Sequence, residues 1–169
     1  MNCPICNKES VANSGFKEAK ILVVRDKPHA TEYASYKSNR FHAPITPLSV
    51  LRDEFFLLGV DFVRVRKANL WHHEPNKKSP DCFQEGLNAL LNDAKGKIGI
   101  LLCGAAPVEY FTDYKVSEVS GLQVESAQLS APFIFASVDS STALSKMGVG
   151  EIRFAVQNFL KKLIEEDIL

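Results

Sequence analysis

The chain has 169 residues, 46% of them hydrophobic and 24% charged, with 20 Lys and Arg balancing 20 Asp and Glu. This length predicts one domain, 1–169, with a core of its own. The zero net charge excludes a global field that draws the chain to nucleic acid or membrane, so a nucleic-acid contact requires a local patch. We expect no membrane association and a cytoplasmic location, because the chain has neither an apolar run of bilayer length nor a signal peptide at its start.

The first segment, 1–18, is polar and lacks the periodicity of a helix or a strand. It carries Cys3 and Cys6, which are separated by two residues in the order Cys-Pro-Ile-Cys. In a cytosolic protein thiols stay reduced, so this pattern indicates a metal or redox site. The alternative is a metal-free tail with a frayed end.

Beyond this segment, apolar runs typical of buried strands alternate with segments of helical period. Thr46 and Ser79 each precede a proline, which is the expected start of a helix. Residues 25–45 form a polar stretch too long for an ordinary connection, which indicates a functional role. We expect strands at 20–24, 61–71, 98–103, 121–129 and 132–138, helices at 46–59, 79–94 and 150–163, and a short helix after Gly104.

This alternation predicts a three-layer α/β/α fold around a mainly parallel sheet of four to five strands. Ligands of such folds bind beyond the carboxyl ends of the strands. Four polar segments follow the predicted strands and meet at that edge: 25–29, 69–73, 104–105 and 139–141.

Further metal ligands are available in the middle of the chain. The segment Trp71-His72-His73-Glu74-Pro75 follows a predicted strand, and Cys82 lies near the start of the next helix. Three cysteines and one histidine suit a tetrahedral zinc ion. If these residues meet, a metal pins the N-terminal segment to the body of the domain. Cys103 lies in an apolar strand and is expected in the core.

The order of these motifs resembles the uracil-DNA glycosylase superfamily, and within it the iron–sulfur branch called family 4. The resemblance extends from Cys3 to the last helix. The family has a Cys-x-x-Cys near its N-terminus and two later cysteines, which correspond to His73 and Cys82 here. The resemblance therefore implies a 4Fe-4S cluster held by Cys3, Cys6, His73 and Cys82, with zinc as the alternative.

The same resemblance implies a base-binding and catalytic site. Asp26 stands in the acidic position after the first strand, Phe41 where a ring stacks on the flipped base, and Asn69 where an amide reads the base edge. The chain departs from the family pattern because both glycines of the first motif are missing and Asp139 replaces the histidine of the last motif. His72 or Lys27 can take the place of that histidine.

Hydrolysis of a base–sugar bond requires a flipped base, stabilisation of the departing base anion, and a carboxylate or positioned water near the sugar. Asp26 can supply the carboxylate, whereas an ionised Asp139 repels the departing anion. Each residue also has a simpler interpretation. Asp26, Asn69 and Asp139 can be turn or capping residues, and Phe41 can anchor a loop in the core.

Two functions remain open. The first is a monomeric DNA glycosylase that excises uracil or another altered base, with catalytic Asp26 and Asp139 and base-binding Phe41, Asn69 and His72. Lys27, Ser141 and Leu144 are then the DNA contacts, with Leu144 as a wedge that fills the gap left by the flipped base. The second is a DNA- or protein-binding member of the same fold without hydrolytic activity.

Overall fold

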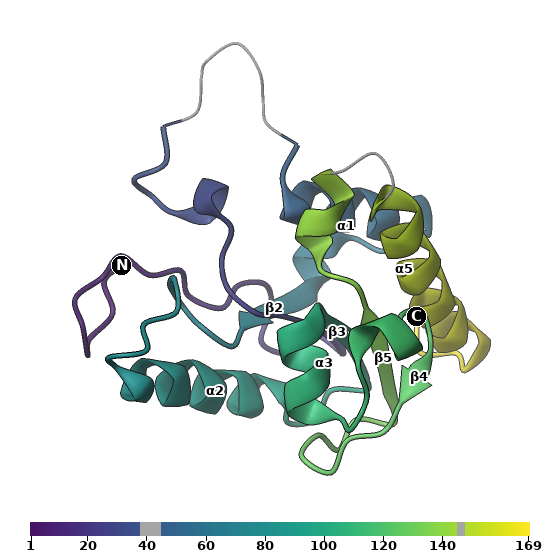
Figure 1. Ribbon diagram of the computed structural model, residues 1–169. Coiled ribbons are helices and arrows are strands. Elements are labelled where there is room, and N and C mark those ends of the chain that lie inside the picture. Colours follow the sequence, from purple (N-terminus) through teal and green to yellow (C-terminus); the bar gives the residue numbers. More distant parts are fainter. Residues whose placement is uncertain (38–44, 145–147) are drawn as a thin grey trace.

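The computed structural model in Figure 1 describes residues 1–37, 45–144 and 148–169. Five strands form one sheet in the order β2-β1-β3-β5-β4. Four of them are parallel, and β4 pairs with β5 in the antiparallel sense, so the predicted mainly parallel sheet is confirmed. The strands are β1 (Ile21–Arg25), β2 (Val65–Asn69), β3 (Gly99–Cys103), β4 (Gln123–Val124) and β5 (Phe133–Ser137).

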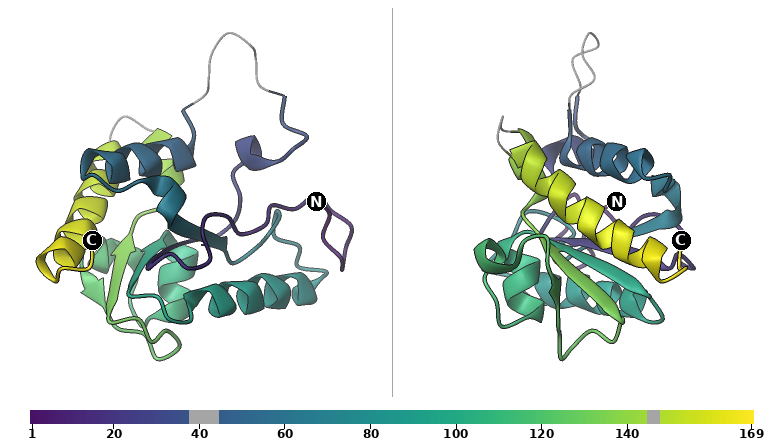
Figure 2. Two further views of the ribbon diagram at one scale, coloured as in Figure 1. Left: turned by 180° about the vertical axis from the view of Figure 1, so that it is seen from behind. Right: turned by 90° about the vertical axis from the view of Figure 1, so that its right-hand side faces the viewer.

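Helices cover both faces of this sheet, which gives the expected three layers (Figure 2). Helices α1 and α5 pack on one face, and α2, α3 and α4 pack on the other. No helix in the described ranges is both long and apolar enough to cross a bilayer. The helices are α1 (Pro47–Leu57), α2 (Pro80–Ala94), α3 (Ala105–Phe111), α4 (Val116–Val119) and α5 (Gly148–Glu165), with 3-10 turns η1 (Ala30–Glu32), η2 (Phe62–Arg64) and η3 (Ser140–Leu144).

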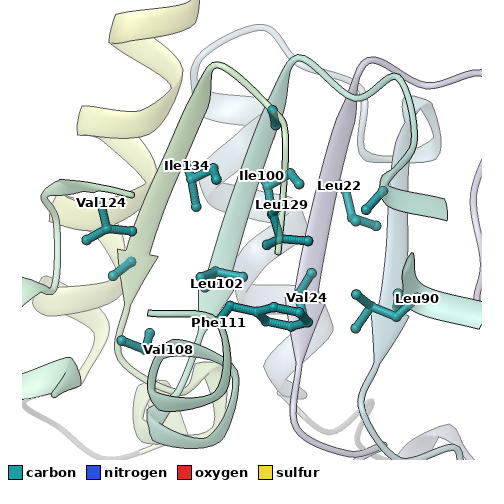
Figure 3. Close-up of a cluster of buried hydrophobic side chains, with 14 of the residues drawn as sticks. Leu22, Val24, Leu90, Ile100, Leu102, Val108, Phe111, Val124, Leu129 and Ile134 are labelled. Carbon is teal, nitrogen blue, oxygen red and sulfur yellow. The ribbon is translucent and has the colours of Figure 1, made fainter. Parts of the chain in front are cut away.

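Strand residues alternate between two apolar clusters, one on each face of the sheet. Ile21 and Val23 of β1 face α1 and α5, whereas Leu22 and Val24 face the opposite layer. Figure 3 shows this second cluster, in which Phe111 of α3 lies over the strands. The two-sided burial explains why these strands are continuous apolar runs in the sequence.

Cys103 lies in the cluster beneath α1 and α5, as expected, and is fully buried. Burial raises the pKa of its thiol to about 12, although the charge of Arg25 opposes this shift. The side chain therefore behaves as a small hydrophobic residue without reactivity.

Two predicted strands are shorter than the sequence suggested. The predicted strand 61–71 is wrong at its start, because the 3-10 turn η2 precedes β2. Asp61 caps this turn by accepting a hydrogen bond from Val63 N (3.0 Å), and Phe62 packs against Phe55 at 5.2 Å between ring centroids. In place of the predicted strand 121–129, only β4 forms.

The helix starts agree with the sequence pattern to different degrees. Thr46 and Ser49 form a reciprocal capping box, in which Ser49 N donates to Thr46 Oγ1 (3.0 Å) and Thr46 N donates to Ser49 Oγ (2.9 Å). Ser79 occupies the predicted cap of α2, but its side chain makes no capping hydrogen bond. Proline at the first helical position is common to both starts.

The N-terminal segment runs along the outer edge of β2. Ser14 and Lys67 exchange two backbone hydrogen bonds, of 2.9 and 2.8 Å. Behind this contact, buried Asp93 pairs with Arg66 (2.9 Å) and accepts a hydrogen bond from Asn13 Nδ2 (2.8 Å). The segment thus covers a sheet edge that would otherwise expose unpaired backbone groups.

Gly15 allows this close approach, and its replacement tests the contact. Its φ is +87°, and a Cβ would lie 2.1 Å from Val65 O. We expect Gly15→Ala to destabilise the fold by about 2–4 kcal/mol in denaturant unfolding, through backbone strain and steric overlap together. Gly96→Ala is the matched control, since Gly96 has φ +71° but no atom within 4 Å of such a Cβ. Equal losses in the two variants would contradict the close packing at β2.

Candidate metal centre

The Cys3–Cys6 segment folds into a tight turn that directs both thiols to one side. Cys3 N donates to Lys8 O (2.7 Å), and Asn7 N donates to Cys3 O (2.8 Å). Asn7 has φ 59°, a left-handed conformation that asparagine tolerates better than most residues. The backbone amides of Ile5 and Cys6 are directed at the Cys3 sulfur. Such amide–sulfur contacts favour a thiolate.

The loop after β2 supplies the histidine. His73 is buried, and its Nδ1 lies 2.7 Å from Glu74 O. A carbonyl oxygen only accepts hydrogen bonds, so Nδ1 carries the proton and Nε2 keeps a free lone pair. That Nε2 lies 3.4 Å from Cys6 Sγ. The imidazole is therefore in the tautomer required of a metal ligand, held there by a backbone contact.

Cys82 completes the group from the first turn of α2. Its Sγ lies 3.7 Å from Cys3 Sγ, and both residues are buried. The four ligand atoms of Cys3, Cys6, His73 and Cys82 all lie within 4.8 Å of one another. The predicted ligand set is thus assembled and can hold a metal ion.

The protonation of the thiols differs across the group. Burial opposes ionisation of Cys3, but the hydrogen bonds from Cys6 and Ile5 prevail and lower its pKa to about 7. Burial raises the pKa of Cys82 to about 12, and the neighbouring thiols add to this effect. A divalent cation would displace the remaining protons, since bound thiols are deprotonated outright.

His72 lies beside this group and does not line the cavity at the carboxyl edge of the sheet that is described below. It lines a cavity of about 20 Å³ together with Ser10, Glu85 and three of the ligand residues, Cys3, His73 and Cys82. Nε2 of His72 and Oε2 of Glu85 are buried without a hydrogen-bond partner in the described part of the chain. Burial lowers the pKa of His72. This volume is large enough for one water molecule.

A second, larger cavity of about 370 Å³ opens at the carboxyl edge of the sheet. Four predicted residues line it together: Asp26, Lys27, Asp139 and Ser141. Asn69 is not among the lining residues. Its side chain is buried at the end of β2, where Oδ1 has no hydrogen-bond partner in the described ranges.

Two predicted residues are not placed. Phe41 lies outside the described residues. Leu144 ends η3, and its side chain is likewise outside the described part. The stacking and wedge roles therefore stay predictions from the resemblance.

The larger cavity is acidic. Burial raises the pKa of Asp26; Lys27 opposes this shift, and the charges of Asp139 and Glu74 add to it. Lys27 is itself paired with Glu74 at 2.6 Å. Asp139 accepts a hydrogen bond from Ser141 N (2.9 Å) at the start of η3, as the capping interpretation predicted. A carboxyl group whose pKa is raised beside a cavity is a typical candidate for proton transfer.

Sequence reasoning missed the role of Arg25 in this wall. Arg25 is buried and makes a bidentate pair with Glu32, at 2.8 and 2.6 Å. Glu32 also accepts a hydrogen bond from His29 N (2.8 Å) and so closes η1. The one signal in the sequence is the charge of Arg25 at the end of an apolar strand. A charged residue in a buried strand is unusual and indicates a partner of opposite charge. No protein-family model and no curated protein matches the chain.

The geometry of this group predicts that the chain binds metal in a fixed ratio and that the fluorescence of Trp71 reports the binding. We expect one equivalent of bound metal per chain, and Cys82→Ala should weaken binding by more than about 100-fold because ligand energy is lost directly. Trp71 is the single tryptophan of the chain, and its ring lies 6.3 Å from that of His73. Its fluorescence should therefore change on metal addition.

Cys103→Ala is the matched control for this experiment, since it removes the one cysteine outside the group. It should leave the metal stoichiometry unchanged. Elemental analysis that finds less than a tenth of an equivalent in anaerobically prepared wild-type protein would contradict the site.

Proposed function

We propose that the four ligands bind a single tetrahedral zinc ion. Bonds of about 2.3 Å in a tetrahedral site place neighbouring sulfurs about 3.8 Å apart. The separation of Cys3 and Cys82 is 3.7 Å. A four-iron cluster, which the family resemblance implies, bonds each ligand to a different iron and so needs a wider ligand set. The compact spacing therefore favours zinc over the cluster.

We propose that the protein acts as a cytoplasmic, monomeric DNA glycosylase-like hydrolase that excises uracil or another altered base. The proposal rests on the resemblance to the uracil-DNA glycosylase superfamily and on one observation that carries it. Asp26, the residue in the family's acidic position, lines a cavity of about 370 Å³ at the carboxyl edge of the sheet. Ligands of parallel α/β folds bind at this edge.

In this mechanism a flipped base enters the cavity and Asp26 acts on the sugar side of the scissile bond. An ionised Asp26 stabilises the oxocarbenium-like sugar or orients the attacking water. Oδ1 of Asn69 has no hydrogen-bond partner among the described residues, so it can accept a hydrogen bond if the base reaches the end of β2. Lys27 lies in the same wall and is a candidate to balance the departing base anion.

A second function, binding without hydrolysis, is favoured by the charge of the cavity. Asp26 and Asp139 line it without a salt-bridge partner among the described residues, whereas Arg25 is paired with Glu32 and Lys27 with Glu74. Negative charge opposes the departure of an anionic base. Any glycosylase activity should therefore be weaker than that of a family member with a histidine at the position of Asp139.

Asp26→Asn separates these functions because it should change activity and stability in opposite directions. Loss of the carboxylate should reduce excision of uracil from an oligonucleotide by about 100-fold or more. Folding raises the pKa of Asp26 above 3.8, so its contribution to stability is full below that value and is lost as pH rises through the folded pKa. At pH 7 the substitution should therefore raise the melting temperature.

Asp113→Asn, at an exposed turn, is the control and should change neither quantity. If Asp26 must be ionised, the acid limb of the pH–rate profile should lie above pH 3.8. Unchanged excision by Asp26→Asn would refute the catalytic role.

Asp139→His tests the charge of the cavity. The substitution removes an anion and offers a donor to the departing base, so it should raise excision by up to about 100-fold. Uracil release from single- and double-stranded oligonucleotides measures this. Complete inactivity of both wild type and Asp139→His would support the binding function and contradict the glycosylase proposal.

A further inference from the structure

The N-terminal segment is attached to the domain in two different ways. Residues 10–18 make contacts that need no metal: Val11 N donates to His72 O (2.7 Å), and Ser14 pairs with Lys67. Residues 1–9 instead form a hairpin closed by an Asn2–Glu9 bridge around the Cys3–Cys6 turn. Figure 1 shows the hairpin beside the loop that precedes α2. Two of the four metal ligands lie in this hairpin, so an ion in the site would fix it in place.

The hairpin also holds the loop that follows β1. The carboxylate of Glu9 accepts two hydrogen bonds from Ser35, one from the backbone amide at 2.9 Å and one from the hydroxyl. These bonds lower the pKa of Glu9. The contact joins residues 26 positions apart, and bonds to an ionised carboxylate are stronger than neutral ones.

Ser35 lies farther along the loop whose first residues form a wall of the larger cavity. Residues Asp26 to Ala30 line that cavity, and η1 follows at once. Near the strand, the Arg25–Glu32 pair holds this wall. Beyond Glu32, the Tyr33 side chain interacts with the backbone of Glu74 in the loop after β2, and Ser35 bonds to Glu9 of the hairpin. The contact with Glu9 is therefore the one that ties this part of the loop to the hairpin.

We propose that Glu9 is a positioning residue that couples metal binding by the hairpin to the order of residues 29–37, the loop segment whose first two residues, His29 and Ala30, line the cavity wall. This inference rests on the proposed metal centre but not on glycosylase activity. Metal binding orders the hairpin, the hairpin presents the Glu9 carboxylate, and the carboxylate fixes Ser35. Loss of the metal releases both donors of Ser35 together. The coupling is reciprocal, so an ordered wall also strengthens metal binding.

Amide hydrogen exchange of the full-length chain tests this coupling. We compare protein loaded with one equivalent of Zn²⁺ and protein treated with excess chelator. In the chelated protein, amides of 29–37 should exchange about tenfold faster, the factor expected for loss of one charged hydrogen bond. Residues 1–9 should also become fast, whereas 10–18 and α1 should stay slow.

The Zn²⁺-loaded Glu9→Ala variant should show the same acceleration in 29–37 while the metal stays bound. Glu9→Gln keeps one acceptor oxygen and should therefore restore part of the protection of 29–37 that Glu9→Ala loses. A side chain that only fills space would not give this difference between the two variants. Lys8→Ala is the matched control, because Lys8 is exposed in the same hairpin and supplies only its backbone carbonyl to the turn. It should behave as wild type.

Slow exchange of 29–37 in chelated wild type, or in Zn²⁺-loaded Glu9→Ala, would overturn the coupling. Failure of Zn²⁺ to bind would appear first, as an unchanged Trp71 fluorescence, and would overturn the metal centre and this inference together. A negative exchange result with Zn²⁺ bound would overturn the coupling alone. Neither the fluorescence nor the exchange measurement depends on uracil excision, so the glycosylase proposal is tested independently.

Discussion

The pairing of β1 with β2 positions both candidate sites. The parallel register sets Arg25 opposite Asn69, so the segments that follow β1 and β2 leave the sheet at the same level. Two further hydrogen bonds extend the ladder past the strands, from Leu70 N to Arg25 O (2.9 Å) and from Trp71 N to Asp26 O (2.8 Å). As a result, the segment that carries the metal ligand His73 lies against the segment that carries Asp26.

This adjacency brings the candidate metal site beside the long loop that joins β1 to α1. The loop leaves the sheet from β1, which lies between the edge strand β2 and the central strand β3. Residues of the N-terminal hairpin and of the loop after β2 stand beside it and supply partners in Glu9 and Glu74. Both partners belong to segments that also provide metal ligands. A metal here stabilises two segments that have little apolar surface to bury.

Much of the fold was predictable because local patterns decided it. The central strands are buried on both faces and therefore read as apolar runs, and the cap-and-proline pattern marked α1 and α2 correctly. The strand predicted over 61–71 failed at its start because Phe62 is drawn toward Phe55 by packing, which no local pattern records. Tertiary contacts overrode strand propensity at that point.

The candidate sites also contain some features that the sequence predicts and others that it does not. The Cys-x-x-Cys spacing together with the family resemblance predicted all four residues of the group that could hold a metal ion, since few residue types bind metal. The contacts that shape the larger cavity were not visible, because the Arg25–Glu32 and Glu9–Ser35 bonds join common polar residues of no diagnostic spacing. His72 shows the limit most clearly. Its neighbour His73 turns toward the thiols, and His72 then lies beside the same group and not in the cavity.

The charge arrangement of the cavity follows from these structural contacts. Each basic group in its wall has a carboxylate partner that also holds the loop, as Arg25 has Glu32 and Lys27 has Glu74. The basic groups therefore help to shape the wall, and Asp26 and Asp139 have no salt-bridge partner among the described residues. Burial raises the pKa of Asp26, so its ionisation at neutral pH costs stability. Residues that lower stability in this way are commonly those that a site requires for binding or chemistry.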